Sequence, residues 1–330
     1  MSLSDPTAPG HFPLLARFRF RMRALEPIRL PPYAGSAWRG LLGRGLRRSA
    51  CVTRAPTCEG CLLIQGCVYP QMFETPPPPG LDLPGFSAVP HPFVLNIDPR
   101  SPRQHAPGEP LELGVTLLGS AIAQVPYLIH ALGVAGQRGI GAGQGTFRLE
   151  ILEREAAPGG GDWEPVYDVE EGVYHQRPAE PLLVPEPPEQ VRLQLLTPLR
   201  IKRGGHFVGV RDFTLSELLR HLYNRLQRLA LLYGGRPAAF AWNREADPAP
   251  GLALQESALR WHDWTRYSSR QDTLMQMGGL LGELRITGPA LPEVWPALWA
   301  GQWTHVGKGT AFGLGDYRLD PSAKGDGASA

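Results

Sequence analysis

Lysine is almost absent from this sequence of 330 residues, which contains only Lys202, Lys308 and Lys324. Arginine therefore carries nearly all of the positive charge, and its planar guanidinium suits phosphate binding and stacking on bases. Basic residues number 33 and acidic residues 31, which gives a net charge of +2. This balance excludes a uniformly basic protein of the histone type, so binding of a polyanion must depend on local patches.

Long apolar runs are also missing. No stretch of about eighteen apolar residues occurs in the sequence, so we expect no membrane span and no membrane partner. The polar segment Met1–His11 lacks the basic start and apolar run of a signal peptide, and we therefore expect a soluble, cytoplasmic protein. A hydrophobic content of 42% excludes a disordered chain, and 330 residues suggest two domains.

Several catalytic signatures are absent as well. The sequence contains neither His-Glu-x-x-His nor a Ser/His/Asp pattern, which disfavours hydrolases of those types. The glycine-rich segment Gly307–Gly315 is not a Walker A loop, because Gly-Lys-Ser/Thr does not occur at the required spacing. A Rossmann motif is excluded too, because no βαβ unit follows this segment.

Hydrophobic periodicity predicts the same order of elements twice. In the first half we expect a strand, helix, strand, strand, helix and strand over Leu14–Leu25, Gly35–Ala50, Phe93–Ile97, Leu111–Leu118, Ser120 to about Val134, and Thr146–Leu152. In the second half we expect the same order over Gln190–Arg203, Phe213–Tyr233, Leu259–Trp264, Leu280–Thr287, Pro292–Ala300 and Asp316–Leu319.

This order is the ferredoxin-like pattern. We therefore predict an α+β protein with tandem ferredoxin-like, RRM-like domains and a cysteine-rich metal-binding insertion. The predicted boundaries are an N-terminal domain at 12–155 with its insertion at 51–67, a linker at 156–189, a C-terminal domain at 190–320 and a disordered tail at 321–330.

Arginines alternate with apolar residues in the first predicted strand, and period two places Arg17, Arg19, Arg21 and Arg23 on one face. The segment from Leu14 to Arg54 holds ten arginines and one acid. Such a local excess is an electrostatic footprint for an RNA backbone. The alternative is a solvated sheet face, which is the commoner outcome for a run of charges.

Two flexible segments of the second half are further candidates for RNA binding. Successive N–H groups of the Gly307–Gly315 turn could form a nest for an anion, although an ordinary glycine-rich connection explains the pattern equally well. A basic turn follows the first strand of this half. The candidate RNA-binding residues of the two segments are Lys202, Arg203, His206, His305, Gly307, Lys308, Gly309, Gly313 and Gly315.

All four cysteines lie within seventeen residues, and the middle pair forms C-x-x-C. Tetrahedral thiolate coordination needs such clustering, so we predict a metal site at Cys51, Cys58, Cys61 and Cys67. Structural zinc is the expected metal, and a [4Fe–4S] cluster is the alternative. Buried reduced thiols are a third interpretation, whereas disulfides are disfavoured in a cytosolic chain.

Taken together, these segments resemble the CRISPR-associated endoribonucleases that process precursor crRNA, the sixth Cas family of the RAMP superfamily. The segments that carry the resemblance are Tyr33–Gly40 with Leu46–Arg48, Cys67–Pro70, Pro90–Phe93, Gly139–Gly141, Thr197–Arg200, Tyr267–Gln271 with Gly278–Gly279, and Gly307–Gly315.

The resemblance implies binding of CRISPR repeat RNA and metal-independent cleavage of precursor crRNA, in which a 2′-OH attacks the adjacent phosphate and leaves a 2′,3′-cyclic phosphate. Members commonly place a catalytic histidine in or near the first helix, but no histidine occurs between Phe12 and Val89. Tyr33, Arg39 and Arg44 occupy that neighbourhood and are the candidate catalytic residues.

Two other functions stay open. One is a non-catalytic crRNA-binding subunit of a CRISPR effector complex, with other subunits of that complex as partners. The second is a redox-responsive or iron-responsive RNA-binding protein built around the cysteine segment. A cleavage assay on repeat RNA distinguishes the first from an endoribonuclease, and an absorbance spectrum tests the second.

Overall fold

The computed structural model describes residues 12–77, 89–234, 247, 249–268 and 273–321, and gives the backbone alone for 265–268 and 273–276. The described residues form two compact units. The N-terminal unit contains those of Pro13–Leu182 and Arg228–Arg236, and the C-terminal unit those of Leu183–Gln227 and Pro237–Ala330. The predicted disordered tail lies outside the described residues, apart from residue 321.

The N-terminal unit is built on a five-stranded sheet in the order β3-β5-β1-β6-β7, in which all the neighbouring strands are antiparallel. Its strands are β1 (Leu15–Ala24), β3 (Phe93–Asn96), β5 (Pro110–Leu118), β6 (Phe147–Glu155) and β7 (Trp163–Asp168). The short strands β2 (Ile28–Arg29) and β4 (Gln104–His105) pair separately.

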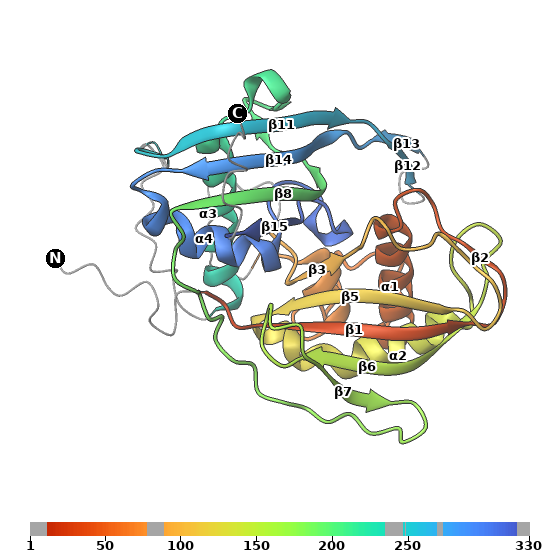
Figure 1. The fold of residues 1–330 in the computed structure, drawn as a ribbon. Helices are drawn as coiled ribbons and strands as arrows, with labels where there is room; N and C mark the ends of the chain where they lie inside the picture. Colours follow the sequence, from red (N-terminus) through yellow and green to blue (C-terminus); the bar gives the residue numbers. More distant parts are fainter. Residues whose placement is uncertain (1–11, 78–88, 235–246, 248, 269–272, 322–330) are drawn as a thin grey trace. The chain divides into compact units, whose positions relative to one another are not determined.

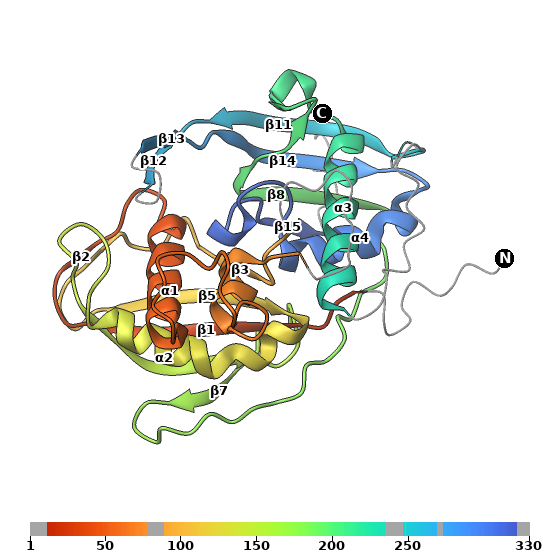
Figure 2. The same ribbon diagram turned by 180° about the vertical axis from the view of Figure 1, so that it is seen from behind.

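Two helices cover one face of this sheet, as the opposite views in Figures 1 and 2 show. They are α1 (Gly35–Ala50) and α2 (Val125–Gly136), and they pack against each other. In β1 the apolar residues Phe18, Phe20 and Met22 are buried while the arginines between them are not. The alternation predicted from the sequence therefore determines which face of β1 forms the core.

Shorter turns of helix complete the N-terminal unit. They are the π-helical turn η1 (Pro70–Glu74) and the 3-10 helix η2 (Gly119–Gln124), which leads directly into α2. The sequence predicted one helix from Ser120, whereas the structure begins with this 3-10 segment, and Ser120 provides no capping hydrogen bond. Pro126 in the first turn of α2 fits the start of an α-helix, because its missing N–H has no partner to lose there.

The C-terminal unit has a four-stranded sheet in the order β11-β14-β8-β15. Its strands are β8 (Gln190–Leu199), β11 (Ala253–His262), β14 (Gly279–Thr287) and β15 (Tyr317–Asp320). Its α-helices are α3 (Leu215–Tyr233) and α4 (Leu291–Thr304), and its 3-10 helices are η3 (Val210–Asp212) and η4 (Thr310–Phe312). Two hairpins lie outside the sheet, formed by β9 (Lys202–Arg203) with β10 (His206–Phe207) and by β12 (Thr265–Ser268) with β13 (Thr273–Gln276).

The two sheets share one topology. If the additional edge strand β7 is set aside, the first strand of each sheet has the fourth strand on one side, and the third and second strands follow on its other side. With a helix after the first strand and another after the third, this arrangement confirms an α+β protein and is consistent with tandem ferredoxin-like units. In the described part of the chain, no helix has the length and apolar character that a membrane crossing requires.

Other predicted segments differ from the structure as well, and β11 begins at Ala253, six residues before the predicted start at Leu259. The predicted linker at 156–189 contains β7, which pairs with β6 and extends the N-terminal sheet. The predicted strand Gln190–Arg203 is divided, because β8 ends at Leu199 and Lys202–Arg203 begins the β9–β10 hairpin. At the start of α3 the Glu217 N–H donates to the Thr214 hydroxyl at 3.2 Å, which is one of the two hydrogen bonds of a capping box.

Candidate RNA-binding site in the N-terminal unit

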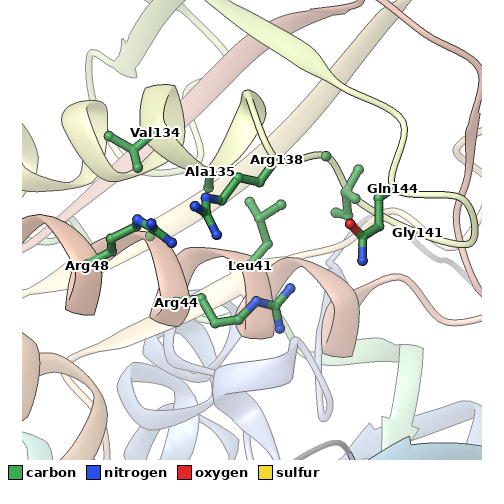
Figure 3. Close-up of a pocket in the computed structure, with 11 residues that line it drawn as sticks. Leu41, Arg44, Arg48, Val134, Ala135, Arg138, Gly141 and Gln144 are labelled. Carbon is green, nitrogen blue, oxygen red and sulfur yellow. The ribbon is translucent and has the colours of Figure 1, made fainter.

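A cavity of about 270 Å³ lies between α1, the end of α2 and the glycine-rich turn that follows α2 (Figure 3). From α1, the residues at spacing i, i+3, i+4 and i+7 face it, which is one side of a helix. The lining residues are Leu41, Arg44, Gly45, Arg48, Val134, Ala135, Arg138, Gly139, Ile140, Gly141 and Gln144. We call this site the arginine pocket.

Close packing of the two helices builds the pocket. A Cβ at Gly45 would lie 2.4 Å from the carbonyl oxygen of Ala131, so only glycine permits this approach of α1 to α2. A Cβ at Gly141 would lie 2.2 Å from the carbonyl oxygen of Arg29, and the Ala142 N–H donates to that oxygen at 2.9 Å. The glycine turn is therefore fixed against the chain after β1, and it forms one wall of the pocket.

The pocket has a positive charge without a matching acid. Arg44, Arg48 and Arg138 are all exposed, and Figure 3 shows Arg48 and Arg138 extending into the space between α1 and α2. None of the three side chains forms an ion pair or a hydrogen bond with the described residues, and no carboxylate lines the pocket. Guanidinium groups in such surroundings favour a bound anion, and phosphate suits their planar fork.

Arg39 lies on another side of α1 and contacts a histidine that is distant in sequence. Its Nη2 lies 3.1 Å from Nε2 of His91, and its guanidinium lies over the Phe73 ring at 5.4 Å. Nδ1 of His91 lies 3.4 Å from the Thr75 hydroxyl. Because arginine can only donate, His91 accepts at Nε2, which requires the neutral imidazole with its proton on Nδ1.

The three candidate catalytic residues are not gathered at one point. Arg39 and Arg44 are five positions apart on α1, so their directions differ by roughly 140° around the helix axis. Tyr33 is half-buried just before the helix begins. Local sequence patterns did not predict the contact between His91 and Arg39, because the two residues are 52 positions apart along the chain. The only sequence signal for His91 was its place in the segment Pro90–Phe93.

The arginines of β1 differ from those of the pocket, because each is paired with a carboxylate. The pairs are Arg17–Glu155 at 2.5 Å, Arg19–Glu153 at 2.6 Å, Arg21–Glu112 at 3.2 Å and Arg23–Glu150 at 2.7 Å. Hydrogen bonds from Arg23 and Arg148 lower the pKa of Glu150. The positive charge of the four arginines on β1 is thus balanced in space by acids on β5 and β6.

The C-terminal glycine turn is packed against its own unit. A Cβ at Gly315 would lie 1.8 Å from the Val306 carbonyl oxygen, and one at Gly307 would lie 2.5 Å from that of Arg200. Gly307, Gly309, Gly313 and Gly315 all have positive φ. Close backbone packing therefore accounts for these glycines, and several N–H groups of the turn are already used within it or toward β8.

His305 corrects one prediction. Its side chain is fully buried, and Nε2 lies 3.7 Å from Oδ1 of Asp316, so it does not present a charge to RNA at the surface. Lys308 in the same turn is exposed, as predicted, and its N–H donates to the Arg200 carbonyl at 2.8 Å. Local sequence alone does not predict that His305 is buried while Lys308, three residues later, is exposed.

The β9–β10 hairpin presents both charge and an aromatic ring. Lys202, Arg203 and His206 are exposed, and the Phe207 side chain is 39% exposed. The Lys202 ammonium lies 4.7 Å from the centre of the Phe207 ring. Bases of single-stranded nucleic acids stack on exposed aromatic rings beside cations. Phe207 was not among the residues that the sequence predicted to bind RNA.

Two family models match the chain. One, described as an N-terminal domain, matches residues 12–179, and another, described as CRISPR-associated endoribonuclease Cas6, matches residues 193–317. Residues 193–317 of the chain carry the Cas6 family domain. This match runs from Leu193 in β8 to Tyr317 at the start of β15 and includes the glycine turn Gly307–Gly315.

One relative matches nearly the whole chain in sequence, and solved Cas6 structures match it in fold. An uncharacterized protein of Archaeoglobus fulgidus is 24% identical over 307 residues, which covers 91% of this chain and 96% of that protein. Thermus thermophilus Cas6 has a TM-score of 0.50 at 15% identity over 93% of this chain and 99% of its own. A Cas6 product complex gives a TM-score of 0.53 at 18% identity over the same shares of both chains.

A longer protein also contains this fold. A chain of a partial Cas6-RT-Cas1–Cas2 complex has a TM-score of 0.54 at 15% identity, with 96% of this chain covering 47% of that one. The Cas6-type fold thus matches about half of that longer chain.

The four cysteines lie between α1 and η1. All four are free and half-buried, and together they line a cavity of about 20 Å³. Cys51 is the C-cap residue of α1, and its hydrogen bond with Thr53 is the main cause that lowers its pKa. Burial raises the pKa of Cys58. Among the described residues, no group of three or more His, Cys, Asp or Glu side chains has an arrangement that could hold a metal ion.

Proposed function

We propose that this chain binds CRISPR repeat RNA and cleaves precursor crRNA by attack of a 2′-OH on the adjacent phosphate, without a catalytic metal. The products would be a 2′,3′-cyclic phosphate and a 5′-OH. The observation that carries the proposal is the arginine pocket, in which Arg44, Arg48 and Arg138 have no carboxylate partner among the described residues. The match of residues 193–317 to the model of the CRISPR-associated endoribonuclease Cas6 supports repeat RNA as the ligand.

The chemistry makes modest demands on the protein. The nucleophile belongs to the substrate, so the protein must mainly hold the 2′-OH in line with the leaving 5′ oxygen, and such positioning alone supplies several kcal/mol. Negative charge increases on the phosphate during attack, and guanidinium groups aimed at it stabilise that state. Arg44 and Arg39 are alternative candidates for this role, because they lie on different sides of α1, and Tyr33 lies just before the start of that helix.

His91 gives Arg39 a defined orientation. Its neutral Nε2 accepts from the guanidinium at 3.1 Å, and Phe73 supports the same group from below its plane. A general base typically raises the rate by a factor of about a hundred or more, and imidazole has the pKa that suits this task near neutral pH. In our proposal, however, His91 has a different role, which is to hold Arg39 in place. Removal of His91 would therefore slow cleavage because Arg39 would lose its orientation.

Outside the arginine pocket, we assign RNA contacts to exposed residues that the sequence predicted. The exposed cations Lys202, Arg203 and Lys308 and the ring of Phe207 are proposed to contact the RNA backbone and an unstacked base. Arg17, Arg19, Arg21 and Arg23 stay candidates of lower weight, since a phosphate would have to compete with their carboxylate partners. Other Cas proteins are proposed as partners, because related folds occur in a Cas6-RT-Cas1–Cas2 complex.

A cleavage assay with end-group analysis tests the proposal. Repeat RNA should be cut in the presence of EDTA, and a single 2′-deoxy nucleotide before the cut should abolish cleavage, because it removes the nucleophile. Arg39→Ala should slow cleavage more than it weakens RNA binding, with His91→Ala acting in the same direction. Arg100→Ala is the matched control, since Arg100 is 88% exposed and pairs with Asp98 at 3.1 Å.

Three results would contradict the mechanism or its site. Cutting of 2′-deoxy RNA, or loss of cutting in EDTA, would exclude the proposed chemistry. Loss of cleavage in His206→Ala with normal activity in Arg39→Ala would move the site to the C-terminal unit. Tight binding of repeat RNA with no cleavage under any condition would instead support the non-catalytic crRNA-binding subunit, which the absence of a histidine from residues 13–88 favours.

A further inference from the structure

The segment from Cys51 to Cys67 has no hydrophobic core of its own. None of its seventeen residues is buried, and Leu62 and Val52 are 98% and 80% exposed. Burial of apolar side chains is the usual source of stability for a folded segment, and small motifs without it depend on disulfides or metals. The described fold of this segment therefore needs another source of order.

Hydrogen bonds supply part of that order. Arg47 on α1 donates to the carbonyl oxygens of Ala55 and Pro56, both at 2.6 Å. The Cys61 N–H donates to the Cys58 carbonyl at 3.2 Å, which closes a turn over the C-x-x-C pair. These bonds face water along most of the segment, and a hydrogen bond of this kind contributes only about 1 kcal/mol net.

The four thiols converge on one small cavity. Cys51, Cys58, Cys61 and Cys67 all line the cavity of about 20 Å³, and its other lining residues include no His, Asp or Glu. The Thr53 hydroxyl lies 3.8 Å from Sγ of Cys51 and 3.9 Å from Sγ of Cys61, which brings these two sulfurs near one point. The available donor set is thus four sulfurs alone.

The donor set suits a single metal ion. A space of about 10–15 Å³ on this scale holds one water molecule, so the cavity of about 20 Å³ has room for one ion. Four thiolates around a single ion of about this size are the tetrahedral set that zinc takes in structural sites, with Zn–S distances of about 2.3 Å.

We propose that Cys51, Cys58, Cys61 and Cys67 bind one Zn²⁺ as thiolates and that this ion holds the 51–67 segment in its fold. Four thiols each release one proton and form four Zn–S bonds, which leaves a site of charge −2 without any oxidation or reduction. The sulfurs draw together around the ion as it binds. The ion would join the C-cap of α1 to the residues just before η1. This role is structural and does not depend on the proposed cleavage reaction.

Metal analysis of the full chain tests the proposal. Protein purified without added metal should contain about one zinc per chain, and the four native thiols should react with a disulfide reagent only after denaturation in EDTA has released the zinc. Replacement of zinc by Co²⁺ should give thiolate-to-cobalt charge-transfer bands and tetrahedral ligand-field bands. Cys58→Ser and Cys61→Ser should each lose most of the zinc, and Thr57→Ala, in the same segment with all thiols kept, should retain it.

Each contrary outcome overturns the assignment. Folded protein with no bound metal and four freely reactive thiols would show that the segment needs no ion. Iron with sulfide and broad visible absorption would assign a cluster, and absence of free thiols after denaturation would assign disulfides. If the serine variants fail to fold, thiol protection and the cobalt spectrum of the unaltered chain still decide between these results.

Discussion

Two groups of arginines in the N-terminal unit differ in their partners. Those on β1 are held by Glu112, Glu150, Glu153 and Glu155 within the sheet, whereas Arg44, Arg48 and Arg138 surround a cavity with no carboxylate. An arginine already paired with an acid gains little from a phosphate, because the acid must be displaced. An arginine side chain without a carboxylate partner gains the full free energy of a charge-assisted hydrogen bond when it binds a phosphate.

This contrast predicts which residues set the salt dependence of RNA binding. Arg44→Ala, Arg48→Ala and Arg138→Ala should each weaken binding of repeat RNA and reduce the slope of log affinity against log salt by about 0.7, because each removes one phosphate contact. Fluorescence anisotropy at several salt concentrations measures both quantities. Arg100→Ala, which alters an exposed arginine paired with Asp98, should leave the slope unchanged.

The equivalent change on β1 should have a smaller effect. An Arg19→Ala, Arg21→Ala double variant should change the slope by less than any single pocket variant, since both arginines are paired with Glu153 or Glu112. A larger loss from the β1 variant than from the pocket variants would show that RNA lies on the sheet face instead.

At this scale the sequence predicted residue types better than their surroundings. The alternation in β1 correctly placed four arginines on one face, but the acids that pair with them lie 91 to 138 residues away, so a local charge count could not include them. His305 and Lys308 differ in burial because the end of α4 and the glycine turn enclose the first and expose the second. Such packing follows from tertiary structure alone.

At the scale of elements, β6 ends in an ion pair that is mostly enclosed. The Glu155 side chain is 2% exposed and accepts from Arg17 at 2.5 Å, from the Gly159 N–H at 3.0 Å and from the Gly161 N–H at 3.1 Å. It therefore fixes β6, β1 and the turn before β7 together. A buried acceptor of three donors is costly to alter, because the donors lose their partner without gaining water.

Glu155→Gln should consequently lower the free energy of unfolding by about 1.5–3 kcal/mol, the range for hydrogen bonds to charged groups. Urea unfolding followed by circular dichroism measures the change. Glu112→Gln is the control on the same sheet, because its side chain is 50% exposed and surface pairs contribute about 1 kcal/mol or less. Equal losses in the two variants would show that burial does not determine the strength of these pairs.

Two glycines in the helix pair allow a matched test of helix packing. A Cβ at Gly45 would meet the Ala131 carbonyl, so Gly45→Ala should force α1 from α2 and destabilise the protein by about 1–3 kcal/mol. A Cβ at Gly133 in α2 would meet nothing within 4 Å, so Gly133→Ala should stabilise the helix by about 0.5–1 kcal/mol. Opposite shifts in the unfolding midpoint are expected, and destabilisation by both would contradict the packing described.

Elements with a clear hydrophobic period were predicted with small boundary errors. The helix over Gly35–Ala50 has the bounds that the sequence indicated, and α3 lies within its predicted range. The strand β7 was missed because its segment is short and surrounded by proline, glycine and acidic residues. The 3-10 start at Gly119–Gln124 depends on close contact at Gly119, where a Cβ would lie 1.9 Å from the Tyr233 carbonyl, and no local pattern reports such a contact.

At the scale of the whole molecule, the proposed reaction predicts its own kinetic limit. The cleaved RNA keeps the phosphates and bases that bind the protein, so the product should leave slowly. With RNA in excess, we expect a burst equal to the concentration of active protein followed by little further cutting. Quenched time courses at two protein concentrations measure the amplitude, and steady turnover well beyond one equivalent would contradict product retention.

The shared strand order of the two units has a consequence for how the chain reaches its native state. In each sheet the first strand is central and is completed only by the last, so the Arg17–Glu155 and Arg192–Asp320 pairs close loops of 138 and 128 residues. Loop entropy must be lost before such contacts form, which slows folding. Until β6 or β15 arrives, one edge of the central strand remains open to strands of other molecules, so a nascent or truncated chain is the form most exposed to aggregation.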